Sequence, residues 1–170
     1  MIPYNPSSPH VETIEREHYE IHEGNHYKCQ DYDDDVDSGV SKFWHVKSPN
    51  TSIRVHLCYK IITSKNGLLE FFEDATFSNS GTTLTVFNNN RNSTNTTTTE
   101  IFKDPIITAS GTRIDVNVLG TDGTGVAGAV GGSSKRTDEI ILKSGTSYIL
   151  KITALSNDTR ISSCFSFYEE

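Results

Sequence analysis

The residues best suited to metal chemistry are the histidines of the N-terminal quarter. His18, His22 and His26 follow one another at intervals of four residues, and imidazole nitrogens bind divalent transition metals. His18 and His22 share one face in a helix and in a strand alike, and His10 or His26 could join them. No matched carboxylate or second histidine cluster accompanies them, so we favour solvated surface histidines. We predict no metal and no cofactor.

A second group of possible metal ligands is acidic. Five aspartates lie within residues 31–37 and are followed by Ser38 and Gly39. Carboxylate oxygens suit calcium, but the spacing lacks the glycine at position six and the closing glutamate of an EF-hand. We therefore predict a solvated loop of mutually repelling side chains. If this loop has a partner, we expect a cation or a basic protein surface.

Motifs for catalysis and phosphate binding are weak. Residues 123–128 match GxGxxG literally, but the residues that follow form a poor helix, and a dinucleotide site requires a helix there. The sequence contains no GxSxG elbow and no P-loop, and none of its histidines stands in an HxH pair. Two acids that meet only in space, as in a glycosidase, leave no trace in spacing. We expect a binding protein and not an enzyme.

The cysteines and the overall charge limit the possible partners. Cys29, Cys58 and Cys164 are far apart without CxxC spacing, which favours free thiols in a reducing cytosol. The formal net charge of -7 argues against a surface for nucleic-acid phosphates. No apolar run approaches the roughly 20 residues that span a bilayer, and the first residues do not read as a signal sequence. We expect neither nucleic acid nor membrane as a partner.

The elements that position these residues are mainly β-strands. The clearest period-two pattern gives one apolar face to residues 51–63, formed by Ile53, Val55, Leu57, Tyr59 and Ile61. Asn66-Gly67 is a tight-turn dipeptide, which predicts that residues 51–63 and 68–73 pair as a hairpin. Residues 15–26 are predicted as a further hairpin and not as a helix, because Gly24 interrupts the third helical turn.

The strand count predicts the fold class. Residues 138–143, 148–155 and 160–168 are expected to form an antiparallel meander that holds the C-terminus inside a sheet. On the order of ten strands, with turns every 8 to 12 residues and no convincing helix, predict an all-β, antiparallel β-sandwich of the jelly-roll type. A chain of 170 residues suits one such domain, which we place at residues 18–170.

Residues 1–17 are predicted to form an extended arm. Pro3, Pro6 and Pro9 recur at every third residue, with Tyr4 between the first two, and three residues is the period of a polyproline II helix. Such an arm can lie across a neighbouring molecule. A frayed terminus is the alternative.

The longest polar segment, residues 84–99, combines asparagines with a threonine run. We interpret it as a crossover between the two halves of the sandwich, in which Asn90 and Asn92 fix the loop geometry. Arg91 has the longest side chain of this segment. We expect its guanidinium to bind backbone carbonyls or an acidic neighbour, within its own chain or across a subunit interface.

Several segments resemble one family. The segments are residues 13–24 (TIEREHYEIHEG), residues 88–93 (NNNRNS), residues 139–143 (EIILK), the strand at Tyr148 and the terminal Tyr168-Glu169. Together they are similar to the head decoration proteins of tailed bacteriophages, over nearly the whole chain beyond the arm. The resemblance implies a cement protein that binds the outer surface of a phage capsid and stabilises it.

This resemblance also implies partners and sites. It implies a homotrimer bound to the major capsid protein, located on the outer surface of the virion head after synthesis in the host cytoplasm. The family has no catalytic residues. The candidate capsid-binding residues are Pro3, Tyr4, Pro6 and Pro9, and the candidate loop or interface residues are Asn90, Arg91 and Asn92.

Two other functions stay open at the level of sequence. The first is a carbohydrate- or receptor-binding jelly-roll module of a virion fibre or tail, with Trp44, Tyr59 or Phe87 as sugar platforms. The second is a cytoplasmic metal-dependent enzyme.

Overall fold

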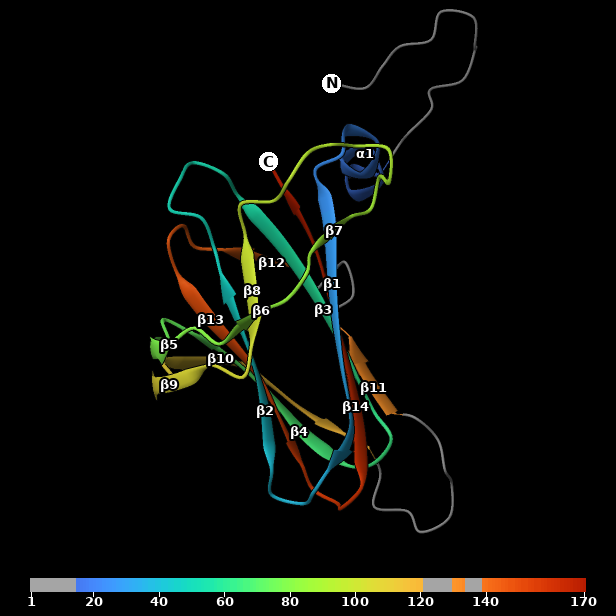
Figure 1. Ribbon diagram of the computed structural model, residues 1–170, viewed down its shortest axis with the longest axis vertical. Helices are drawn as coiled ribbons and strands as arrows, with labels where there is room; N and C mark the ends of the chain where they lie inside the picture. Colours follow the sequence, from blue (N-terminus) through green and yellow to red (C-terminus); the bar gives the residue numbers. More distant parts are fainter. Residues whose placement is uncertain (1–14, 121–129, 134–138) are drawn as a thin grey trace, which may run out of the picture.

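The computed structural model describes residues 15–120, 130–133 and 139–170. Strands dominate this part of the chain, and two antiparallel sheets pack face to face (Figure 1). A short helix, α1 (Arg16–Glu23), lies at one end. The predicted all-β, antiparallel sandwich is confirmed. The prolines and Tyr4 of the predicted arm lie outside the described residues.

Each of the two large sheets contains six strands. In order across the first sheet lie β11 (Val130–Ser133), β3 (Val55–Thr63), β14 (Thr159–Glu169), β1 (His26–Val36) and β7 (Phe87–Asn88), and β12 (Ile140–Leu142) also pairs with β3. In order across the second sheet lie β10 (Thr112–Leu119), β4 (Gly67–Glu73), β13 (Ser147–Ala154), β2 (Ser41–Lys47), β8 (Glu100–Lys103) and β6 (Thr82–Thr83). A separate two-stranded sheet joins β5 (Thr76–Asn79) and β9 (Ile106–Ala109).

Neighbouring strands along the chain mostly belong to different sheets, which overturns two pairing predictions. Residues 51–63 and 68–73 do not form a hairpin, because β3 and β4 lie in opposite sheets and Asn66-Gly67 turns the chain between them. The C-terminal meander is also wrong, since β12 pairs with β3, β13 with β2 and β4, and β14 with β1 and β3. Alternation marks the buried face of a strand, but either sheet can supply what covers that face. The prediction that the C-terminus is held inside a sheet is confirmed, because β14 is a central strand.

The core lies between the two sheets. The alternating residues of β3 that were expected to face inward, Val55, Leu57, Tyr59 and Ile61, are all buried. Aromatic rings join the layers: the Phe71 ring stacks on Tyr148, with centroids 5.6 Å apart, and Trp44 meets Phe165 edge-on at 6.2 Å. Burial of such side chains is the main favourable term for a domain of this size.

The aspartate-rich segment is a strand and not the predicted loop. Residues 31–36 belong to β1, which pairs with β14. The repulsion between the carboxylates is relieved by neighbours from the second sheet. Asp31 accepts a hydrogen bond from the Trp44 indole N–H at 3.0 Å, and the Lys42 ammonium lies 2.8 Å from an Asp33 oxygen. Local charge therefore did not decide the backbone conformation here.

A small second core lies on the outer face of the second sheet. His45 of β2 and Ile149 of β13 are 1% and 0% exposed although they point away from the main core. The His45 ring stacks on Phe77 of β5 at 3.9 Å and on Phe102 of β8 at 5.1 Å. The β5–β9 pair, at the left of Figure 1, therefore covers this face.

Burial lowers the pKa of His45 below its ordinary value of 6.5, and this predicts a pH-dependent stability. The unfolded chain takes up a proton at a higher pH than the folded chain does. The contribution of His45 to the free energy of unfolding should therefore be complete above pH 6.5. It should be lost as the pH drops toward the lower pKa of the folded state. Urea unfolding over this range measures the effect. In His45→Phe, which keeps a ring between Phe77 and Phe102, the fall should be smaller; an unchanged fall would contradict the assignment.

Candidate functional site

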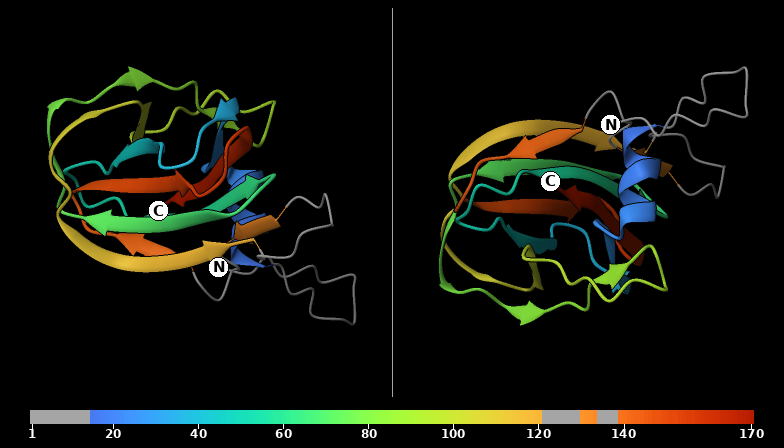
Figure 2. Two further views of the ribbon diagram at one scale, coloured as in Figure 1. Left: turned by 90° about the horizontal axis from the view of Figure 1, so that it is seen from below. Right: turned by 90° about the horizontal axis from the view of Figure 1, so that it is seen from above.

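Helix α1 lies across one end of the sandwich, beside residues 84–99 (Figure 2, right). The predicted hairpin at residues 15–26 is wrong because Gly24 ends the helix and does not interrupt it. Gly24 has a φ of 77° and donates its N–H to Ile21, while Asn25 donates to the Glu20 carbonyl at 2.9 Å. This pair of bonds is the Schellman motif, which glycine favours because it lacks a Cβ atom.

Three asparagine amides complete the C-terminal end of this helix. Asn90 donates to the carbonyl of His22 at 3.1 Å, Asn95 to the carbonyl of Glu23 at 3.3 Å, and Asn88 to the carbonyl of Gly24 at 2.7 Å. The last carbonyls of a helix have no partner within the helix. The asparagine loop therefore supplies donors where α1 needs them, and it fixes the helix to the sandwich.

The crossover prediction for residues 84–99 is confirmed. Strand β6 belongs to the second sheet, β7 pairs with β1 in the first, and β8 returns to the second. The asparagines also fix their own loop. Asn90 donates its N–H to the Asn88 side-chain oxygen, and its own side-chain oxygen accepts the N–H of Asn92 at 3.1 Å.

Within the part of the chain that the structure describes, the contacts of Arg91 are local. Its guanidinium donates to the Asn88 carbonyl at 3.4 Å and lies over the Phe87 ring, 5.4 Å from the centroid. A contact with a backbone carbonyl was expected, and one is found within the chain. The side chain is exposed.

The carboxylate of Glu169 fixes the end of the polar segment. It is buried, and one of its oxygens accepts hydrogen bonds from the backbone N–H and hydroxyl of Thr99, at 2.8 and 2.7 Å, and from the Thr97 hydroxyl at 2.7 Å. The Thr98 N–H reaches both oxygens, at 3.0 and 3.1 Å. Hydrogen bonds to a charged acceptor are stronger than neutral ones. The last residue of β14 therefore anchors a threonine run about seventy positions earlier.

Ion pairs connect the start of α1 to the C-terminus. The Arg16 guanidinium lies 2.7 Å from Glu20 and 2.6 Å from Glu170. Glu170 also lies 3.1 Å from His56 Nε2. The first turn of α1 is thus tied to Glu170, which directly follows β14.

The His26 ring contacts both α1 and the asparagine loop. The Asn89 amide lies 2.6 Å from its Nδ1, and Glu17 lies 3.1 Å from its Nε2. If the amide donates, the ring accepts at Nδ1 and donates at Nε2, which satisfies a neutral imidazole. Burial lowers the pKa of His26, against the opposing effect of Glu17. The neutral ring is therefore the form that this site favours.

An open polar pocket of about 550 Å³ lies at this end. Its walls combine amides, hydroxyls and carboxylates with one tyrosine and one isoleucine: Asn25, Tyr27, Ile53, Thr94, Asn95, Thr96, Thr98, Glu169 and Glu170. Glu169 is already occupied by its threonine donors, so the pocket offers mainly neutral polar groups and the Glu170 carboxylate.

The sequence indicated part of this arrangement. Asn90 does fix loop geometry, whereas Asn92 contributes its backbone N–H. The pairing of asparagines with helix carbonyls was missed, as was Glu169. Asparagine next to a predicted helix end is a signal that could have found the first. Nothing in the spacing could have joined Glu169 to the threonines, because only the fold brings them together.

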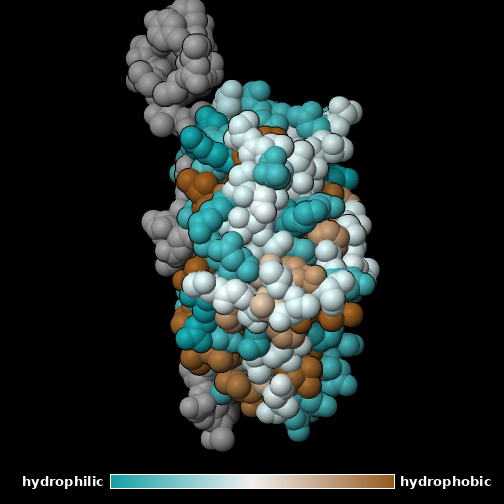
Figure 3. All heavy atoms as spheres, turned by 90° about the vertical axis from the view of Figure 1, so that its left-hand side faces the viewer, coloured by the Kyte–Doolittle hydropathy of each residue, from teal (hydrophilic) through white to brown (hydrophobic). Residues whose placement is uncertain are grey.

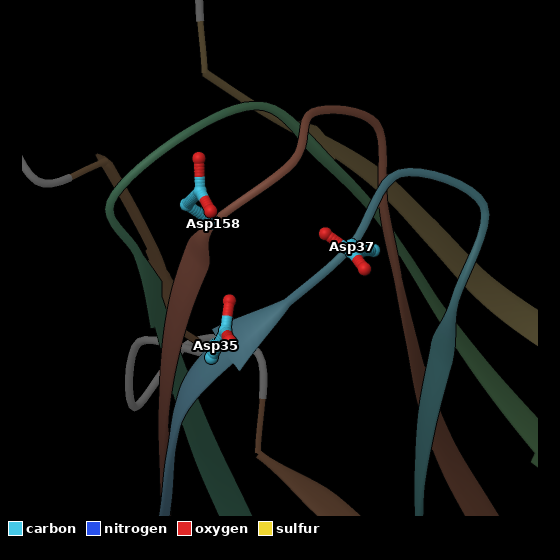
Figure 4. A group of neighbouring side chains, drawn as sticks. All are labelled: Asp35, Asp37 and Asp158. Carbon is cyan, nitrogen blue, oxygen red and sulfur yellow. The ribbon is translucent and has the colours of Figure 1, made fainter.

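The opposite end of the sandwich carries three exposed carboxylates, from Asp35, Asp37 and Asp158 (Figure 4). Their oxygens lie within 4.8 Å of one another. Asp158 also has Lys65 3.7 Å away. No other feature of the described residues points to a ligand here, so the three acids alone do not define a metal site.

The remaining candidates are placed as follows. None of the three cysteines is in a disulfide, as predicted, and burial raises the pKa of Cys29 to about 12. Trp44 and Tyr59 are buried in the core, whereas Phe87 is 46% exposed. Within the described ranges, no helix has the length and apolar composition needed to cross a bilayer.

Comparison of the chain with protein-family models, curated proteins and solved structures gave no match.

Asn90 and Asn92 form a matched pair for testing the role of the loop. Asn90→Ala removes a donor to α1 and the acceptor for Asn92, and should lower the free energy of unfolding by about 1 kcal/mol. Asn92→Ala keeps the backbone N–H that Asn92 contributes, so its effect should stay within about 0.5 kcal/mol. Urea unfolding at one protein concentration measures both. Equal effects of the two substitutions would contradict the capping role of Asn90.

Glu169→Gln should lower the free energy of unfolding more than Asn90→Ala does. It replaces a carboxylate that accepts several hydrogen bonds with an amide. We expect the free energy of unfolding to fall by about 2–4 kcal/mol. Glu100→Gln is the control, because Glu100 pairs with Lys47 on the exposed surface and should contribute less than about 1 kcal/mol. The same unfolding measurement decides: a loss for Glu169→Gln no larger than that for the control would show that the buried carboxylate does not anchor the threonines.

Proposed function

We propose that this protein is a decoration protein that binds the outer surface of a bacteriophage head and stabilises it. In this proposal the major capsid protein is its partner, the chain acts as a homotrimer without catalytic activity, and it joins the virion after synthesis in the host cytoplasm. The observation that carries the proposal is the braced end of the sandwich, formed by α1, the asparagine loop and the C-terminus.

The braced end supports an arm that works as a tether. The segment with Pro3, Tyr4, Pro6 and Pro9 precedes α1 in the chain, and α1 is held by Arg16–Glu170 and by the asparagine amides. A tether transmits force only when its base resists being pulled out of the body. When many copies bind a repeating lattice, the weak affinities of single arms would combine into a high overall affinity.

The strand order supports a jelly roll within the sandwich. The order β1-β14-β3 in one sheet and β2-β13-β4 in the other, with the chain changing sheets after β1, β2 and β3, is what we interpret as this connectivity. Virus capsid and lectin domains use it, and its sheet edges are available for contacts between subunits.

The surface offers a place for a second copy of the chain. β10 ends the second sheet, and Ile114, Val116 and Val118 on this strand are exposed, Val118 by 73%. Hydrophobic side chains gather mainly in the lower half of the face in Figure 3, away from the end that carries α1. Edge strands with exposed apolar residues favour association. This separation would leave the arm end free for the capsid.

A carbohydrate- or receptor-binding module is the second candidate. The polar pocket supports this candidate, because hydroxyls and amides can hydrogen-bond a hydroxyl-rich ligand. Against it stands the burial of Trp44 and Tyr59, and the Arg91 guanidinium lies over the exposed Phe87 ring. A sugar platform needs an open aromatic face, so we favour the decoration protein.

Deletion of residues 2–12 should abolish binding to purified heads and leave the body folded. The contacts that hold α1 are made by Arg16 and the asparagine amides, which the deletion keeps, so circular dichroism and thermal unfolding should match those of the full chain. Cosedimentation with heads measures binding. Asp35→Asn with Asp37→Asn, at the opposite end of the sandwich, is the control and should bind normally. Normal binding by the truncated protein would remove the arm from the proposal.

A further inference from the structure

Helix α1 carries two histidines that the proposed function does not use. His18 and His22 are exposed, and their Nε2 atoms lie 3.0 Å apart. The rings meet edge-on, with centroids 4.7 Å apart and planes at 73°. In an α-helix, residues four positions apart lie on one face, so the two Nε2 atoms lie at hydrogen-bonding distance from each other. A metal ion bound by both rings would replace this hydrogen bond.

This separation matches a particular coordination geometry. Two nitrogens about 2.1 Å from a metal ion lie about 3.0 Å apart when they subtend a right angle, and about 3.4 Å apart when they subtend a tetrahedral angle. The observed 3.0 Å fits the right angle. Octahedral and tetragonal ions such as Ni²⁺ and Cu²⁺ use right angles, and imidazole is a suitable ligand for both.

The helix that carries the pair is already ordered. Its C-terminal carbonyls are occupied by Asn88, Asn90 and Asn95, and Arg16 holds its first turn to Glu170. Asn90 binds the carbonyl of His22 itself. A site on a rigid element binds more tightly because less conformational freedom is lost on binding.

We propose that His18 and His22 chelate a divalent transition-metal ion of the Ni²⁺ and Cu²⁺ class through their Nε2 atoms. The two rings occupy adjacent positions in the coordination sphere of the ion. Water, or donors from another molecule, fill the others. This inference does not depend on the binding of a capsid.

Titration of the untagged full chain with NiCl₂ near neutral pH tests the site. Ni²⁺ is a better probe than softer ions, because the thiols of Cys58 and Cys164, neither of which is in a disulfide, compete for softer ions. Isothermal calorimetry should show one site per chain. His18→Gln and His22→Gln should each weaken binding by at least about tenfold, and glutamine keeps the helix propensity of these exposed positions.

Thermal unfolding gives a second readout. Excess NiCl₂ should raise the Tm of the wild type, since an ion that binds only the folded chain stabilises it, and should leave the Tm of the double variant unchanged. Asp35→Asn with Asp37→Asn is the matched control for the acidic group and should bind Ni²⁺ like the wild type. The proposal is overturned if the wild type shows neither heat of binding nor a rise in Tm, or if the folded double variant binds as tightly as the wild type.

Discussion

The end of the sandwich that carries α1 depends on the hydrogen bonds of the Glu169 carboxylate. This carboxylate lies at the end of a central strand and gathers the threonine run at residues 97–99 through backbone and hydroxyl donors. That anchor sets the path of residues 84–99. The path brings the asparagines to the C-terminal end of α1, so the position of the helix follows from a buried charge that belongs to a different part of the chain.

The two ends of the sandwich consequently differ in kind. One end carries α1 and a dense set of hydrogen bonds and ion pairs, including the contact of Arg16 with Glu170. The other end presents exposed carboxylates from Asp35, Asp37 and Asp158. Repulsion among acids suits a surface that faces water, whereas the braced end suits the base of a binding arm. This difference agrees with the proposed role as a decoration protein, in which one side would meet the capsid and the other would meet solvent.

The sequence allowed the sandwich to be predicted, but not the partners of its strands. Alternation in β3 identified the buried face correctly, since burial of one face imposes period two. The same alternation could not tell a hairpin from a crossing between sheets. Gly24 was misread because glycine weakens a helix interior and also ends a helix. The aspartates of β1 looked like a loop because the lysines and Trp44 that stabilise them come from other strands.

Electron microscopy of purified empty heads mixed with the protein is the most direct test of capsid binding. We expect added density on the outside of the head, at repeated positions of the lattice. Heads that stay bare while the protein labels a tail or fibre would contradict it and favour the receptor-binding alternative. Heads and tails that both stay bare would contradict it as well.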